Sequence, residues 1–203
     1  SFLAGITDGK DADALIKAEI EKGTFEEGDI EQGSDMVAQR IADSRATMDA
    51  QAGANLASGN KEKNKAAAEL VNNKLDNDSF RDVVKAGLIS EELVSGDTKE
   101  DQLEDADNQI DRIMEMIADG TKLIDNDKKI ANVIGSTAVM DAKDKGNASE
   151  LGTLTGGTDE ARAAANEMIK LTDAMTALTE MLDGQAEDDA TKTVKLAEGT
   201  TFT

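Results

Sequence analysis

The chain has 203 residues, and its 43 acidic residues against 22 basic ones give a formal net charge of −21. It contains no His, Cys, Pro, Trp or Tyr, which excludes Ser-His-Asp and Cys-His catalysis, disulfides and zinc sites built from Cys or His. Such a negative charge disfavours nucleic acid and anionic membrane surfaces, because both are bound mainly through Lys and Arg. We therefore expect no nucleic-acid partner.

The composition favours helices over strands. Proline, which breaks helices, is absent, and aromatic residues make up only 2% of the chain, whereas strands depend on aromatic and β-branched residues. No segment approaches the roughly 20 apolar residues of a transmembrane helix. The sequence therefore predicts a soluble all-α protein: an elongated helical bundle with coiled-coil-like helices, short helical hairpins and an irregular C-terminal tail.

Residues 1–76 are predicted to form an N-terminal helical region. A short helix runs to about residue 22, and Thr24 and Glu27, at capping-box spacing, open a turn interrupted by Gly28 and Gly33. A longer helix is predicted at about 35–57, and another follows the break at Gly59 and ends near residue 75. The apolar stripe of the longer helix consists of Val37, Ile41, Met48, Ala52 and Leu56.

Residues 77–97 are predicted to form a small helical hairpin. Gly87 has the position of a helix C-cap, and Ser90 has that of the next N-cap. The acidic residues on this hairpin make DNA recognition by it improbable.

Residues 98–184 are predicted to form a helical bundle that contains two heptad-patterned helices. The first opens at Thr98, with Asp101 in its first turn, and ends at Gly120. Its apolar residues, spaced alternately by three and four, are Leu103, Ala106, Ile110, Ile113 and Ile117. One or two shorter helices are expected within 121–146, and a Gly/Thr loop is expected at 147–157.

The second heptad-patterned helix opens at Thr158 and is predicted to end at Gly184. Its stripe consists of Ala161, Ala164, Met168, Leu171, Met175, Leu178 and Leu182. Further apolar residues flank both stripes, namely Met114, Met116, Ala165, Ala174 and Met181. Such widened stripes favour a bundle of three or more helices, which is formed either within one chain or between subunits.

Residues 185–203 are predicted to form a polar C-terminal tail, in which 191–196 alternate as in a short strand. Two of the four Phe residues lie close to the ends of the sequence. Phe2, with Leu3, and Phe202 are therefore candidate anchors that insert into neighbouring subunits.

No motif assigns a cofactor, a metal or a catalytic residue. Residues 5–10 resemble a phosphate loop but are one residue short, and Asp11 stands where Ser or Thr would bind magnesium. Residues 152–158 precede a helix N-terminus, yet Asp159 and Glu160 already occupy its positive end. The Asp-x-Asp pairs lack the further ligands of a calcium loop, so weak surface binding of Ca²⁺ or Mg²⁺ is the most that they predict.

These observations favour a non-enzymatic structural or assembly protein that associates with itself or docks into a larger particle, with a phage capsid or tail component as the narrower hypothesis. The alternative is an acidic adaptor or chaperone-like module that binds a basic partner, and a less favoured one is an enzyme that uses only carboxylates and a metal. The residues predicted to bind partners are Phe2, Leu3, Leu103, Ile110, Ile113, Ile117, Met168, Leu171, Met175, Leu178, Leu182 and Phe202.

Overall fold

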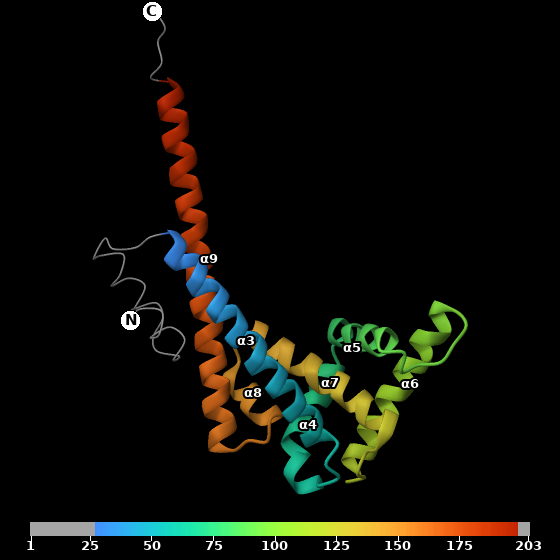
Figure 1. The fold of residues 1–203 in the computed structure, drawn as a ribbon. Coiled ribbons are helices and arrows are strands. Elements are labelled where there is room, and N and C mark those ends of the chain that lie inside the picture. Colours follow the sequence, from blue (N-terminus) through green and yellow to red (C-terminus); the bar gives the residue numbers. More distant parts are fainter. Residues whose placement is uncertain (1–26, 199–203) are drawn as a thin grey trace, which may run out of the picture. The chain divides into compact units, whose positions relative to one another are not determined.

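The computed structural model describes the backbone of residues 27–198, and side chains at 35, 37–176, 179, 180 and 183. Within this range the protein is all-α, with seven helices and no strand, as predicted (Figure 1). The helices are α3 (Glu27–Leu56), α4 (Lys61–Leu75), α5 (Asp78–Ser90), α6 (Lys99–Ala118), α7 (Asp125–Asp144), α8 (Ala148–Leu154) and α9 (Asp159–Glu198). The helix predicted before residue 22, the segment that resembles a phosphate loop, and Phe2, Leu3 and Phe202 lie outside the described residues.

The described residues fall into two compact units. Residues 43–169 form the central unit, while residues 27–42 of α3 and 170–198 of α9 belong to the terminal unit. Helices α3 and α9 therefore each contribute to both units, and each unit is described by itself.

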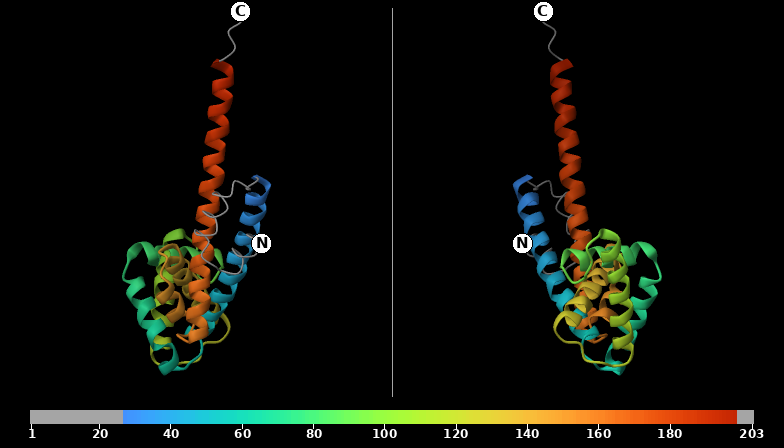
Figure 2. Two further views of the ribbon diagram at one scale, coloured as in Figure 1. Left: turned by 90° about the vertical axis from the view of Figure 1, so that its left-hand side faces the viewer. Right: turned by 90° about the vertical axis from the view of Figure 1, so that its right-hand side faces the viewer.

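Helix α7 is the centre of packing in the central unit, where it contacts α4, α5, α6 and α8. Helices α4 to α7 lie together in both views of Figure 2. Aliphatic side chains fill the core, and fully buried ones include Leu88, Ile110, Ile113, Ile134, Leu151 and Leu154. Several predicted stripe residues are thus buried, including Ile110 and Ile113 of α6.

Local capping signals determine where several helices begin, as the sequence indicates. Helix α6 starts after Thr98, as predicted, and there Thr98 and Asp101 form a capping box. The Thr158 hydroxyl accepts a hydrogen bond from the Ala161 N–H at 3.1 Å at the start of α9. Gly59, with φ +70°, ends the turn after α3, and Asn60 caps α4. These polar groups satisfy backbone N–H groups that the first helical turn leaves unpaired.

Helices α3 and α7 cross at two glycines. A Cβ atom on Gly135 would lie 3.0 Å from the backbone nitrogen of Gly53 and 3.2 Å from the carbonyl carbon of Ala52. A Cβ atom on Gly53 would lie 3.1 Å from the Cα of Asn132. The two backbones approach this closely because neither glycine carries a side chain, which lets α3 pack directly on α7.

The predicted turn at Gly87 is wrong, because α5 continues through Gly87 and ends at Ser90. Residues 91–98 are not helical, so the second helix of the predicted hairpin does not form. A Cβ atom on Gly87 would lie 2.8 Å from Cγ1 of Val133. This glycine therefore serves the close contact between α5 and α7 rather than the end of a helix.

Three other predicted interruptions are also helical. Helix α3 begins at Glu27 and passes through Gly28 and Gly33, and α8 forms within the expected loop 147–157, capped by Asn147. Helix α9 continues through Gly184 to Glu198, so neither the predicted helix end there nor the possible strand at 191–196 is correct. One glycine costs a helix only about 1 kcal/mol, which the good helix formers around it offset.

Candidate functional site

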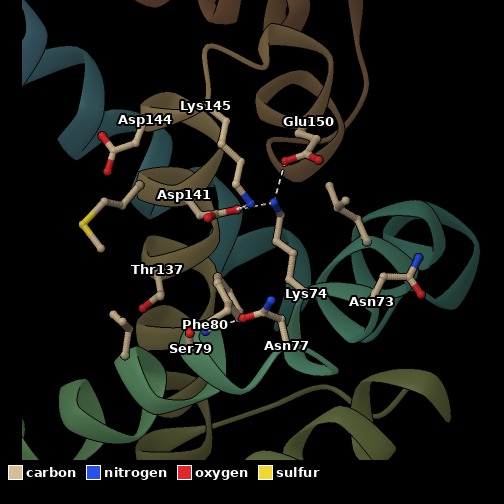
Figure 3. A pocket seen from close by; sticks show the side chains of 13 residues that line it. Asn73, Lys74, Asn77, Ser79, Phe80, Thr137, Asp141, Asp144, Lys145 and Glu150 are labelled. Carbon is tan, nitrogen blue, oxygen red and sulfur yellow. Dashed lines mark hydrogen bonds and ion pairs between the residues drawn. The ribbon is translucent and has the colours of Figure 1, made fainter.

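A groove of about 800 Å³ lies between α4, α5 and α7 in the central unit (Figure 3). Its apolar part is formed by Leu70, Phe80, Val83 and Met140, and its polar part includes Lys74, Asn77, Ser79, Asp141, Lys145 and Glu150. We call it the Lys74 groove. It combines these four apolar side chains, which we call its apolar floor, with several hydrogen-bonding groups, which is the usual make-up of a binding site.

The sequence around α4, α5 and α8 positions the polar residues of this groove. The Asn77 side chain caps α5 by accepting a hydrogen bond from the Phe80 N–H at 3.2 Å. Asn147 caps α8 by accepting from the Glu150 N–H at 3.1 Å. These two caps place Phe80 and Glu150 in the first turns of their helices, where both line the groove.

The ammonium group of Lys74 joins three helices (Figure 3). Its Nζ donates to Asp141 of α7 and to Glu150 of α8, each at 2.5 Å, and only 8% of its side chain is exposed. Asp141 also accepts from Lys145 at 2.9 Å. The pair with Glu150 links α8, which has only seven residues, to α4.

Electrostatics keep the Lys74 network charged. Burial by itself disfavours the ammonium of Lys74, but hydrogen bonds to Asp141 and Glu150 outweigh it and raise the pKa of Lys74 above its ordinary value. Burial likewise opposes ionisation of Asp141, yet hydrogen bonds from Lys74 and Lys145 lower its pKa. Lys74 is therefore protonated at neutral pH and does not supply the neutral amine that a nucleophilic lysine needs.

Sequence reasoning missed Lys74, although a signal was present. Lys74 follows Ala67 by seven positions and Val71 by three, and both of those residues are buried. A lysine at this spacing lies on the core-facing side of the helix. Its acidic partners Asp141 and Glu150 are far away in the sequence, so no local pattern predicts that Lys74 pairs with them.

A second, smaller groove of about 430 Å³ lies between α3, α7 and the end of α5 and includes Asp49, Lys129 and Ser136. The Oδ1 atom of Asp49 is buried and has no hydrogen-bond partner among the described residues. Arg45 Nε lies 3.7 Å from the other carboxylate oxygen. Burial raises the pKa of Asp49 more than the positive charge of Arg45 lowers it.

Replacing Asp49 with Asn is expected to stabilise the protein near neutral pH. Because the pKa of Asp49 is higher in the folded state than in the unfolded state, ionised Asp49 lowers the stability at pH values above its folded pKa. This loss disappears below the pKa of Asp49 in the unfolded chain, about 4. Circular dichroism should thus show a higher melting temperature for Asp49→Asn near neutral pH, with the difference closing below about pH 4. Asp173→Asn removes an equal charge from an exposed position of α9, and an equal rise there would contradict the assignment.

One flank of α6 is neutralised by cations from the same chain. Arg81 bridges Asp107 at 2.7 Å and Asp111 at 2.8 Å, and Lys85 lies 3.1 Å from Asp107. Hydrogen bonds from Arg81 and Lys85 overcome the effect of burial and lower the pKa of Asp107. These pairs fasten α5 to α6, although their partial exposure limits what each contributes to stability.

None of the residues predicted to bind partners is exposed where the structure describes its side chain. Ile110, Ile113, Ile117 and Met168 are buried in the central unit, Leu171 is buried in the terminal unit, and Leu103 and Met175 are half-buried. The side chains of Leu178 and Leu182 lie outside the described part of the chain. A partner could reach the buried α6 residues only if the central unit opened.

The buried face of α9 agrees with the predicted stripe at Ala161, Met168 and Leu171, but not at every position. Ala164 is exposed, whereas the flanking residues Ala165 and Ala174 are buried. Met175, another residue of the predicted stripe, is only half-buried. The buried side of α9 therefore combines part of the predicted stripe with its flanking alanines.

Among the residues that the structure describes, no three carboxylates converge on a possible metal ion. None of the described helices combines the length and the apolar character that crossing a membrane requires. The chain shows no match to protein-family models, to curated proteins or to solved structures.

Proposed function

We propose that this protein is a non-enzymatic structural or assembly subunit, which joins copies of itself or docks into a larger particle through apolar helix faces and terminal anchors. The observation that carries the proposal is α9. It is a continuous helix of 40 residues, about 60 Å long. Helices of this length without internal caps are typical of coiled coils and extended bundles.

The register of α9 supports association between helices. With Met168 and Leu171 at heptad positions a and d, every a, d, e and g position from Met168 to Leu182 is uncharged. The charged residues of this segment, Lys170, Asp173 and Glu180, fall at the outer positions. In a chain with a net charge of −21, such a face lets copies approach without like charges in contact.

In the terminal unit, the α9 segment that carries this face is longer than the α3 segment. The α9 segment of this unit covers residues 170–198, whereas the α3 segment covers only 27–42. The α3 segment of this unit is thus little more than half as long as its α9 segment. We propose that an assembly partner packs along this part of α9, and that the predicted anchors Phe2, Leu3 and Phe202 add to its contacts.

Size-exclusion chromatography with light scattering tests this proposal. We expect an oligomer that persists at high ionic strength, because apolar contacts do not weaken with salt. Leu182→Asp would place a charge in the a/d face and should shift the protein toward monomer. Thr176→Asp, which adds the same charge at an exposed outer position, should leave the mass unchanged, and a monomeric wild-type chain would contradict self-association.

Within this class we propose a virion component, such as a phage capsid or tail subunit. The support is the combination of long helices, apolar faces and terminal Phe residues in a chain without His or Cys. The genomic neighbours of its gene provide the test, since capsid and tail genes beside it would agree with this proposal and unrelated metabolic genes would oppose it.

The exposed face of α6 favours the second candidate function, an adaptor for a basic partner. Glu100, Glu104 and Glu115 are exposed and form no ion pair among the described residues, in contrast to Asp107 on the neutralised flank. Binding through this face would weaken steeply as salt screens the charges. A titration of complex formation against ionic strength therefore separates the adaptor from the self-associating subunit.

A further inference from the structure

We propose that the Lys74 groove is a binding site for a small uncharged amphipathic molecule that has a carbonyl or amide oxygen and an apolar body. This inference is independent of the assembly proposed above. It rests on an unused hydrogen-bond donor, on the balance of charges in the groove and on the apolar floor.

The unused donor belongs to Lys74. A lysine ammonium has three N–H groups, and two of them donate to Asp141 and Glu150. The third N–H group has no acceptor among the described residues. Lys74 lines the groove, and only 8% of its side chain is exposed. An acceptor oxygen on a molecule in the groove would complete the coordination of this buried charge.

The charges in the groove favour an uncharged ligand. Asp141, Asp144 and Glu150 would repel a carboxylate, while Lys74 and Lys145 would repel an ammonium group. The carboxylates of Asp141 and Glu150 are also already paired with lysines, so an ionic ligand would have to compete with existing ion pairs. A neutral oxygen accepts from Lys74 without breaking them.

The floor of the groove supplies the apolar contacts. Leu70, Phe80, Val83 and Met140 come together there from α4, α5 and α7. Val83 is 46% exposed, and it is one of two large apolar residues that are exposed among the described residues. The groove volume of about 800 Å³ falls within the range of small-molecule sites, so an alkyl or aryl body fits beside these residues.

The probe for the test is N-hexylacetamide, compared with hexanoate and hexylamine as charged molecules of similar length. Binding is followed by the NMR signal of the Met140 methyl group in the full chain. We expect the amide to shift this signal saturably and both charged probes to bind at least about five-fold more weakly, equivalent to about 1 kcal/mol. No saturable shift, or equal binding of a charged probe, would overturn the proposal.

Two matched variants locate the site. Val83→Asn removes an exposed apolar residue from the floor and should weaken binding of N-hexylacetamide about five-fold. Ile124→Asn makes the same kind of change at the other exposed apolar residue, which is 64% exposed and lies outside the groove, and it should leave binding unchanged. Equal effects of the two variants would show non-specific partitioning and would refute a site at Lys74.

Discussion

Replacing Lys74 with Met is expected to lower the free energy of unfolding by about 3 kcal/mol. The change leaves Asp141 and Glu150, whose side chains are only 23% and 24% exposed, without their shared cation. Removing one member of a buried ion pair costs more than the pair contributed, because the remaining charge stays desolvated. The expected loss of stability is at the lower end of the range for broken buried ion pairs, because both carboxylates are partly exposed and Lys145 still pairs with Asp141.

Urea denaturation of two control variants identifies the cause. Lys65→Met removes a lysine from an exposed position of the same helix and should change stability by less than about 0.5 kcal/mol. The triple variant Lys74→Met, Asp141→Asn, Glu150→Gln should recover a large part of the loss, because neither carboxylate remains; Lys145 loses its partner Asp141, but its side chain is 63% exposed and stays hydrated. If Lys74→Met were no more harmful than Lys65→Met, the ion pair would not hold α8 in place.

The pH dependence of stability gives a second readout for Lys74→Met. The lowered pKa of Asp141 adds stability that is present above its unfolded pKa of about 4 and is lost as the pH falls through the folded value. The raised pKa of Lys74 adds stability that is present below its unfolded pKa of about 10.4 and is lost as the pH rises through the folded value. Between these limits the wild-type advantage should be constant, and it should shrink on either side.

Replacing Gly135 with Val is expected to destabilise the central unit by about 3 kcal/mol. The new Cβ atom would lie 3.0 Å and 3.2 Å from backbone atoms of Gly53 and Ala52, and the branched methyl groups would require still more space. Because the neighbouring atoms belong to the backbone of α3, no side-chain rotation relieves the contact. Helices α3 and α7 would have to move apart, which also opens the apolar core between them.

Gly152→Ala is the matched control for this prediction. Gly152 also lies inside a helix, but the atom nearest to its added Cβ is Cγ of Arg162, at 3.0 Å. The side chain of Arg162 is 63% exposed and can shift, so stability should change by less than about 1 kcal/mol. Chemical denaturation of Gly135→Val and Gly152→Ala should therefore give clearly different midpoints, and equal midpoints would show that the α3–α7 crossing tolerates a side chain.

Local sequence signals were sufficient for the helical content and for several helix ends. The start of α6 after Thr98, the break at Gly59 and the start of α9 after Thr158 depend on residues within one turn of each other. The burial of Ile110, Ile113 and Ile117 likewise follows from a regular apolar spacing along one helix. Such features form from neighbours in the chain, which is why the sequence alone predicts them.

Glycines were interpreted correctly only where backbone conformation decides their role. Gly59 has a positive φ and ends a turn, as predicted, whereas Gly87 and Gly184 lie within helices. At Gly87 the close approach of Val133 from α7 explains the residue. A glycine required by a neighbouring helix and a glycine that ends a helix look the same in a single sequence.

The sequence by itself determined that this is an acidic helical protein without His or Cys, since composition and periodicity depend on the chain alone. Only the tertiary structure decided which sides of its helices are buried and which groups meet. It left Ala164 and Met175 of the predicted α9 stripe out of the core, and it brought Lys74 to Asp141 and Glu150 across 67 and 76 positions of sequence. Contacts at such separations depend on how whole helices pack, and that packing forms the groove in which a ligand site is proposed.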